Sequence, residues 1–270
     1  MNPDFTGKVV LVTGASAGIG EATALLFAKL GAQLALVGRN AENLRSVAVR
    51  CAEEKGLQPL EILTDLSTDE GAEKTAKDTV EHFGRLDVLV NNAAEGSRSF
   101  IQGAEMEVFD RMVRTNLRAV YNLTRLLVPE LVKTKGNIIN VSSVAATNAY
   151  PGNLAYSITK AALDHFSRII AVELAPKGVR VNTVSPGITV SKFVQRVTGA
   201  SDEQYQAWLT AVSTGIPLKR ACTADDVAYA IVHLASDHSA IVTGALLVVD
   251  GGVQFTDASH LVEKQKLLRQ

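Results

Sequence analysis

Residues 9–30 of the chain read VVLVTGASAGIGEATALLFAKL. Residues 9–12 are apolar and largely β-branched, a pattern typical of a strand that is covered on both faces of a sheet. The next eight residues are rich in glycine, and residues 21–30 have the apolar spacing of a helix. A strand, a glycine-rich turn and a helix in this order indicate a phosphate-binding site, because glycine lets the backbone approach a pyrophosphate and the helix N-terminus presents free N–H groups. The spacing is Gly-x-x-x-Gly-x-Gly, which differs from the common dinucleotide fingerprint.

The rest of the chain continues this alternation of apolar strands and helices. Further strands are predicted at residues 34–37, 58–63, 86–90, 137–141, 179–184 and 246–249. Helical patterns lie between them, including a long one over residues 105–133 and another that extends to about residue 174. Seven apolar strands that alternate with helices predict an α/β fold, a doubly wound, Rossmann-like seven-stranded parallel sheet. No internal repeat or linker composition divides the chain, so we expect a single domain over residues 1–254.

Composition excludes several classes of function. The 270 residues include 27 basic and 28 acidic side chains, and this balance argues against nucleic acid or an anionic membrane as the main partner. Two cysteines, Cys51 and Cys222, cannot form a disulfide framework and suit a reducing compartment. No apolar run reaches the ~20 residues of a membrane span, and the first strand begins too early for a signal peptide. We therefore expect a cytoplasmic protein. The scattered histidines predict no metal site.

Tyr156 and Lys160 are four residues apart in a helical pattern, so they share one helix face. A phenol titrates near ~10 in water, and a nearby ammonium lowers that pKa, which makes tyrosine a usable general acid or base. Taken alone, the pair fits more often an amphipathic helix with an unimportant tyrosine and a solvated lysine. The remaining polar residues decide between the two interpretations.

Polar side chains follow the second and third predicted strands. Arg39 comes just after Gly38, where an NAD site would want a carboxylate, and its charge could bind a 2′-phosphate with help from Ser16 and Asn40. The alternative is an exposed arginine at a helix start. Asp65 could accept a hydrogen bond from an adenine amino group, or cap the helix that begins near residue 68, or do both.

Three later strands end in the same way. Asn91 and Asn92 follow the fourth strand, where side-chain amides can tie neighbouring loops together. Ser142 and Ser143 follow the fifth, and Ser185-Pro186-Gly187 ends the sixth. Asn116 lies within a helical pattern, where asparagine is unfavourable, so it is expected to serve something other than helix stability. All these residues lie at or beyond the carboxyl ends of strands, where such sheets bind ligands.

Residues 189–216 form a long, partly apolar excursion between the sixth and seventh strands, and they contain the only tryptophan, Trp208. Insertions of this kind are often lids over an active site. A peripheral helix pair packed on the body is the alternative. The lid interpretation predicts that Trp208 lies near the substrate.

Taken together in chain order, the motifs of this sequence resemble those of the short-chain dehydrogenases/reductases of the ~250-residue type. The resemblance covers about residues 5–254. Its motifs are Thr13-Gly14-x-x-x-Gly18-Ile19-Gly20, Asp65, Asn91-Asn92-Ala93, Asn116, Ser143, Tyr156-x-x-x-Lys160 and Pro186-Gly187. The spacing of thirteen residues before Tyr156 (156 − 143 = 13) selects Ser143 over Ser142 as the family's serine.

The resemblance implies a role for each catalytic residue. Tyr156 would exchange a proton with the substrate oxygen, and Ser143 would hold that oxygen by hydrogen bonding. Lys160 would bind the nicotinamide ribose and lower the pKa of Tyr156, and Asn116 would hold a water that continues the proton relay. The candidate cofactor-binding residues are Gly14, Ser16, Gly18, Ile19, Gly20, Arg39, Asn40, Asp65, Leu66, Asn92, Ala93, Tyr156, Lys160, Pro186, Gly187 and Thr189.

The sequence departs from the family pattern in three places. Ala94 stands where glycine is usual, which reduces backbone freedom beside the cofactor. Thr189 and Ser191 replace an aliphatic residue and a threonine, so contacts with the nicotinamide amide are less defined. Residues 255–270 extend beyond the usual end and have no role that the sequence reveals.

These observations favour an NADP(H)-dependent enzyme that reduces a ketone or aldehyde of a largely apolar substrate to the alcohol. A 3-oxoacyl chain, a ketosteroid and a xenobiotic ketone all fit an apolar lid. A catalytically silent NADPH-binding sensor or scaffold is the alternative, but it would be expected to lack part of the catalytic set. The helix after Lys160 is apolar on more than one face, which together with the resemblance predicts a homo-oligomer, and a tetramer in particular.

Overall fold

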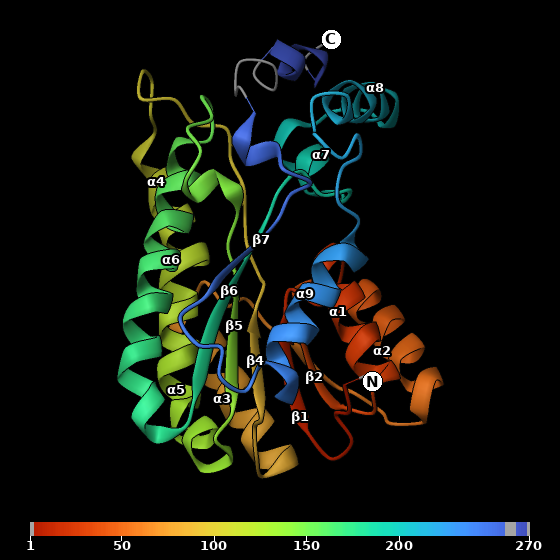
Figure 1. Cartoon of the computed structure of the whole chain (residues 1–270), viewed down its shortest axis with the longest axis vertical. Helices are drawn as coiled ribbons and strands as arrows, with labels where there is room; N and C mark the ends of the chain where they lie inside the picture. Colours follow the sequence, from red (N-terminus) through yellow and green to blue (C-terminus); the bar gives the residue numbers. More distant parts are fainter. Residues whose placement is uncertain (1–2, 257–262, 269–270) are drawn as a thin grey trace.

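The computed structural model describes residues 3–256 and 263–268. Within them, seven strands form one sheet in the order β3-β2-β1-β4-β5-β6-β7, and every neighbouring pair is parallel (Figure 1). This confirms the predicted doubly wound fold. The strands are β1 (Val9–Thr13), β2 (Gln33–Gly38), β3 (Leu60–Leu63), β4 (Val88–Asn91), β5 (Asn137–Val141), β6 (Arg180–Pro186) and β7 (Leu246–Val249).

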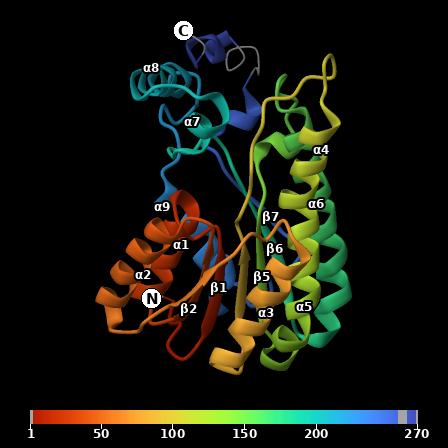
Figure 2. The same cartoon turned by 180° about the vertical axis from the view of Figure 1, so that it is seen from behind.

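Helices cover both faces of the sheet, as right-handed crossovers between parallel strands require. One face carries α1 (Gly18–Lys29), α2 (Ala41–Lys55) and α9 (Ala224–Ala235) (Figure 1). The other face carries α3 (Asp69–Phe83), α5 (Ala119–Thr134) and α6 (Leu154–Leu174), and the view from behind shows the same two layers (Figure 2).

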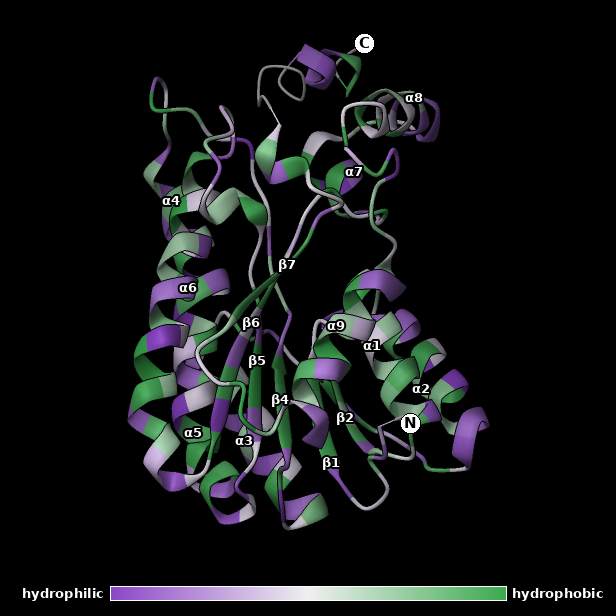
Figure 3. Cartoon of the chain, viewed as in Figure 1, coloured by the Kyte–Doolittle hydropathy of each residue, from purple (hydrophilic) through white to green (hydrophobic). Residues whose placement is uncertain are grey.

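Two apolar cores lie on either side of the sheet. Because side chains alternate along a strand, Val10 and Val12 of β1 join the core beneath α1 and α9, whereas Val9 and Leu11 join the core beneath α5 and α6. Figure 3 shows the strands in hydrophobic colours between helices of mixed character. Burial on both faces explains why the strands read as continuous apolar runs.

Several expected elements differ by one to three residues in their bounds, and in two of them the difference has a clear physical cause. The third strand begins at Leu60 rather than residue 58, because Pro59 has no N–H to donate to the strand ladder. The helix expected over residues 105–133 consists of α4 (Met106–Val113), the π-helical turn η1 (Arg114–Arg118) and α5. The π turn inserts one extra residue per turn and rotates the following helix.

The excursion between β6 and β7 forms two helices above the carboxyl edge of the sheet, α7 (Phe193–Thr198) and α8 (Asp202–Ser213) (Figure 1). Thr189 at its start forms a parallel β-bridge with Cys222, six residues after its end, so the chain segments that enter and leave the excursion are held together. Tyr205, Trp208 and Val212 of α8 point into a third apolar cluster.

Short helical turns complete the described chain: η2 (Val144–Ala146), η3 (Ala175–Lys177), η4 (Asp237–Ser239), η5 (Val253–Phe255) and η6 (Gln265–Leu268). The predicted C-terminal extension, residues 255–270, is thus described in part, and residues 257–262 and 269–270 lie outside the described residues, as do residues 1–2 at the other end. No helix in the described ranges is long and apolar enough to cross a membrane. The same ranges contain no group of His, Cys, Asp and Glu side chains arranged to hold a metal ion.

Candidate active site

A cavity of about 930 Å³ lies at the carboxyl edge of the sheet and extends from the glycine-rich turn to η6. It is lined by all the candidate site residues except Gly20 and Asn116. These residues come from loops far apart in the sequence, which meet because the carboxyl ends of parallel strands share one edge of the sheet.

The glycine-rich turn needs its glycines for two reasons. Gly14 and Gly18 have φ of +66° and +59°, a backbone region that favours glycine. At Gly20 an added Cβ would lie 2.2 Å from the Gly14 carbonyl oxygen. Gly20 does not line the cavity, and its lack of a side chain allows α1 to pack against the turn. The N-cap residue Ala17 provides no side-chain cap, which leaves the first N–H groups of α1 available to an anion. This arrangement fits a pyrophosphate.

Asn92 braces that turn. Its Nδ2 donates to the carbonyl oxygens of Thr13 at 2.8 Å and Gly14 at 3.3 Å. The Thr13 hydroxyl in turn accepts from the backbone N–H groups of Asn92 and Ala93, at 2.9 and 3.0 Å. The expectation that side-chain amides tie neighbouring loops together is confirmed for Asn92. Asn91 instead ends β4 and donates to Asn140 of the neighbouring strand β5 at 2.9 Å.

Arg39 lies at the adjacent edge of the cavity, between two carboxylates. Its Nη1 is 3.7 Å from Asp65 Oδ2 and its Nη2 is 3.9 Å from Glu95 Oε1, while 56% of its side chain remains exposed. Partial burial would raise the pKa of Asp65, but hydrogen bonds from Ser67 and the charge of Arg39 outweigh it and lower that pKa. An ionised Asp65 therefore accompanies Arg39 at neutral pH.

Asn40 and Asp65, which also line the cavity, accept hydrogen bonds from nearby backbone N–H groups. Asn40 caps α2 by accepting from the Asn43 N–H at 2.8 Å. Thr68, and not Asp65, caps α3, accepting from the Gly71 N–H at 3.0 Å, whereas Asp65 Oδ1 accepts from the Ser67 N–H. The capping alternative for Asp65 is therefore wrong, because a cap must directly precede the first turn.

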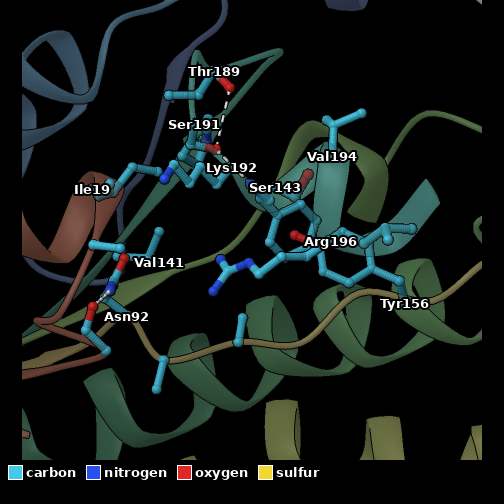
Figure 4. A pocket seen from close by; sticks show the side chains of 18 of the residues that line it. Ile19, Asn92, Val141, Ser143, Tyr156, Thr189, Ser191, Lys192, Val194 and Arg196 are labelled. Carbon is cyan, nitrogen blue, oxygen red and sulfur yellow. Dashed lines mark hydrogen bonds between the residues drawn. The ribbon is translucent and has the colours of Figure 1, made fainter. Parts of the chain in front are cut away.

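Ser143, Tyr156 and Lys160 come together where β5, η2 and α6 meet. Ser143 is the N-cap of η2, and its Oγ accepts from the Ala145 N–H at 3.1 Å. Tyr156 is in the first turn of α6, and Lys160, one turn further, is only 2% exposed. The Lys160 ammonium donates to the Val141 carbonyl at 2.7 Å and lies 5.8 Å from the centre of the Tyr156 ring. Figure 4 shows Ser143 and Tyr156 on one wall of the cavity.

Burial dominates the ionisation of this pair. It raises the pKa of Tyr156 to about 12, an effect opposed by hydrogen bonding with Ser143. Burial also lowers the pKa of Lys160 to about 8, an effect opposed by the nearby Asp164 carboxylate. The expectation that Lys160 lowers the pKa of Tyr156 is therefore corrected. The Lys160 charge is turned toward the Val141 carbonyl, and desolvation of the phenol outweighs other influences.

Asn116 lies in the π turn η1, fully buried. Its Oδ1 accepts from the Glu95 N–H at 2.8 Å, and its Nδ2 donates to the Glu95 carbonyl at 2.9 Å and to Thr159 Oγ1 at 3.3 Å. The side chain thus joins the loop after β4 to α6 beside Tyr156 and Lys160. This explains why an asparagine occurs in a helical segment.

Several cavity residues were missed by sequence reasoning. Arg98 lies in the loop after β4, and Lys192 and Arg196 lie in or next to α7 (Figure 4). Phe193 places its ring 5.8 Å from the Tyr156 ring. Gln265 and Leu268 of η6 complete the lining. Phe193, Val194 and Val197 belonged to the partly apolar excursion expected from the sequence, whereas the isolated charges at Lys192 and Arg196 and the C-terminal segment gave no signal.

Comparison with known proteins gives a consistent result. Residues 14–254 match the family model described as enoyl-(acyl carrier protein) reductase. The chain is 37% identical to 3-oxoacyl-[acyl-carrier-protein] reductase of Thermotoga maritima, over 92% of this chain and 98% of that protein. It is also 37% identical to D-erythrulose reductase of Gallus gallus, over 93% of this chain and 98% of the relative.

Solved structures agree with these matches. L-sorbose reductase from Gluconobacter frateurii, complexed with NADPH and L-sorbose, superposes with a TM-score of 0.88 and 33% identity, over 94% of this chain and 99% of that one. A protein of unknown function from Caenorhabditis elegans, solved with cofactor, gives a TM-score of 0.90 and 33% identity, over 96% and 99% of the two chains.

Proposed function

The chain belongs to the short-chain dehydrogenase/reductase family, and from this premise we propose that it is an NADPH-dependent carbonyl reductase acting on a largely apolar ketone or aldehyde. Membership makes it an oxidoreductase of the CH–OH/C=O type that binds a nicotinamide cofactor. The choice of NADPH, the direction of reaction and the substrate class are the proposal.

The observation that carries the proposal is the meeting of two hydroxyls, Ser143 and Tyr156, at one wall of the cavity, with the Lys160 ammonium buried behind them. A Tyr156 pKa of about 12 keeps the phenol protonated at neutral pH, so it can donate a proton to a carbonyl oxygen as charge develops there. The Ser143 hydroxyl can donate a second hydrogen bond to the same oxygen. Both hydroxyls can therefore serve the reduction of a carbonyl group.

The residues present fit a dinucleotide. The free N–H groups of α1 would hold the pyrophosphate, and Arg39 with Ser16 would hold a 2′-phosphate. Asp65 and Leu66 would border the adenine, and Lys160 would donate to the ribose hydroxyls. Bound NADPH supplies the hydride, while the protein supplies position and the proton.

The substrate would enter beneath the excursion at residues 189–216, which we propose is a lid. Support comes from its inward residues, since Phe193, Val194 and Trp208 line the same cavity as Tyr156. These side chains favour a substrate with apolar substituents next to its carbonyl group.

The test is Tyr156→Phe, which removes the proton donor and little else. Oxidation of NADPH with a panel of ketones should fall by a factor of roughly 10²–10⁴, whereas NADPH binding measured by cofactor fluorescence should be nearly unchanged. Tyr229→Phe, at an exposed tyrosine of α9, is the matched control and should keep full activity. A Tyr156→Phe enzyme within a few-fold of wild type would rule out the mechanism. A wild-type protein that binds NADPH and reduces none of the panel would favour the silent sensor instead.

A further inference from the structure

The cavity extends beyond the part of the chain that matches the family. The family match ends at residue 254, yet Gln265 and Leu268 of η6 line the same cavity as Ser143 and Tyr156. Residues after 254 therefore contribute to the site, although their sequence gave no indication of a role.

Leu268 is packed as a core residue. It is 6% exposed and belongs to the third apolar cluster together with Trp208 and Val212 of α8, and Leu267 packs against the same cluster. Figures 1 and 2 both place η6 beside α8, above the carboxyl edge of the sheet. The segment is therefore docked on the lid by buried apolar side chains.

The same cluster reaches the reacting groups. Val144, the residue after Ser143, is one of its buried members and also lines the cavity. Val144, Trp208, Val212 and Leu268 thus belong to one apolar cluster that lines the cavity, from the residue after Ser143 to the C-terminal segment. We call these four residues the distal wall.

We propose that the segment Gln265–Leu268 completes a substrate subsite, the distal wall, which binds an apolar chain or ring attached to the reacting carbonyl. This rests on the proposed function. An apolar group displaces water from these side chains favourably. A polyhydroxylated ketone would instead lose hydrogen bonds to water against a surface whose four side chains include no charged group. We therefore expect the distal wall to bind an apolar substituent in preference to a polyhydroxylated one.

The test compares kcat/KM for nonan-2-one, butan-2-one and L-sorbose in four proteins. These are the wild type, Leu268→Ala, a chain that ends at Thr256, and the control Lys266→Ala. Lys266 is exposed on the same turn η6 and does not line the cavity. The wild type should prefer nonan-2-one to both other ketones. The ratio of nonan-2-one to butan-2-one should fall at least about fivefold in Leu268→Ala and in the shortened chain, the effect of losing contact with one or two methylene groups. Lys266→Ala should keep the wild-type ratio.

A second readout does not depend on turnover. Trp208 is the only tryptophan, and its Nε1 is buried with no hydrogen-bond partner among the described residues. Removal of the segment should expose the indole and shift its emission to longer wavelength. Nonan-2-ol, added with NADP⁺, should change that emission in the wild type at lower concentration than in the shortened chain. This titration remains informative even if no ketone is reduced, so failure of the subsite and failure of the proposed function are distinguishable.

An unchanged ketone ratio and unchanged emission in a folded shortened chain would overturn the proposal, as would an equal loss in Lys266→Ala. If the shortened chain does not fold, as judged by circular dichroism, Leu268→Ala alone decides. If Leu268→Ala then keeps the wild-type ratio of kcat/KM for nonan-2-one to butan-2-one, the proposed subsite is wrong.

Discussion

At the residue scale, Tyr156 and Lys160 are governed by the same cause with opposite results. Burial disfavours the charged form of each, which raises the pKa of the phenol and lowers that of the ammonium. Asp164, one turn beyond Lys160 and only partly satisfied by Ser142, provides the opposing charge. The catalytic pair is thus one end of a buried row along a single face of α6.

The first prediction concerns pH. With a pKa of about 8, Lys160 is charged below pH 8 and loses its proton above it. The neutral amine would hold the ribose of the cofactor less firmly, so the rate of carbonyl reduction should fall as pH rises through about 8. Asp164→Asn removes the carboxylate that raises the pKa of Lys160, and the decline should move to lower pH. Asp225→Asn, at an exposed position of α9, is the control. A pH profile of kcat/KM that Asp164→Asn leaves in place would contradict the role given to this carboxylate.

The proposed preference for NADPH also rests on one residue. Arg39 is about half exposed and already near two carboxylates. The ratio of kcat/KM for NADPH to that for NADH should therefore be roughly tenfold, near the lower end of the range for one charged contact. Arg39→Leu should abolish that preference, and added salt should weaken it in the wild type. The measurement is kcat/KM for both cofactors, with Arg45→Leu on the exposed surface of α2 as control.

Gly38 is a less suitable position for this experiment. A Cβ there would lie 3.2 Å from the Ser16 side chain and 3.3 Å from Leu44, so an aspartate would disturb the turn as well as repel a phosphate. If Arg39→Leu keeps the wild-type preference for NADPH, Arg39 is a surface arginine and the cofactor assignment is wrong.

At the scale of elements, the carboxyl terminus of α9 shows how one strand residue holds a helix. Arg180 of β6 donates to the carbonyls of Leu234 at 2.9 Å and Val242 at 3.1 Å, and through its other nitrogen to Ser236 at 3.2 Å. A guanidinium at this position complements the partial negative charge of the helix end.

Arg180→Ala should therefore destabilise the protein. It leaves several partly buried carbonyl oxygens without donors, and we expect the free energy of unfolding to fall by about 2–4 kcal/mol. Urea denaturation measures this, with Lys177→Ala in the exposed turn η3 as control. A loss below about 0.5 kcal/mol would mean that water replaces the guanidinium without cost.

The strands and helices were predicted well from the sequence where the local pattern of residues determines them. Apolar runs located the strands of the sheet most clearly where a strand is buried on both faces, as in β1. The edge strand β3 was also located, although it contains Glu61 and its Leu63 is 50% exposed. The π turn at Arg114–Arg118 was not predicted, although Asn116 had been noticed, and the hydrogen bond of Asn116 to Glu95, twenty-one residues earlier, is a long-range contact that local pattern does not reveal. Likewise, the choice of Thr68 over Asp65 as cap depends on where the first turn begins, which sequence fixes only within a few residues.

At the scale of the whole molecule, the site was predictable in its cofactor half and less so in its substrate half. The cofactor half is built from strand ends, and strand ends can be located from the sequence. Lys192, Arg196 and Leu268 instead reach the cavity through the packing of α7, α8 and η6 over the sheet. Such packing has no local signature, because the same apolar spacing would serve a helix pair placed elsewhere.

Exposed apolar side chains on α5 and α6 indicate that copies of the chain associate. Ile158, Ile169 and Val172 lie along one stripe of α6, with exposed fractions of 47%, 53% and 77%, on the side away from the buried Leu163 and Ala171. Tyr121 of the neighbouring α5 is also exposed, and its ring lies 5.6 Å from that of Phe166. The exposed His165 lies on the same stripe. Exposed apolar side chains that gather on two neighbouring helices are typical of an interface between subunits, and we propose that this surface pairs with the same surface of a second copy.

Light scattering at micromolar concentration should accordingly give a multiple of the 28.7 kDa chain mass, with four copies expected. Ile169→Asp places a charge in the centre of this surface and should reduce the mass, because burying an unpaired carboxylate is strongly unfavourable. Leu57→Asp, at an exposed leucine in the loop after α2, should leave the mass unchanged. A wild-type protein that scatters as a single chain would show that α5 and α6 face solvent, and a drop in mass with Leu57→Asp alone would move the interface to the opposite face of the sheet.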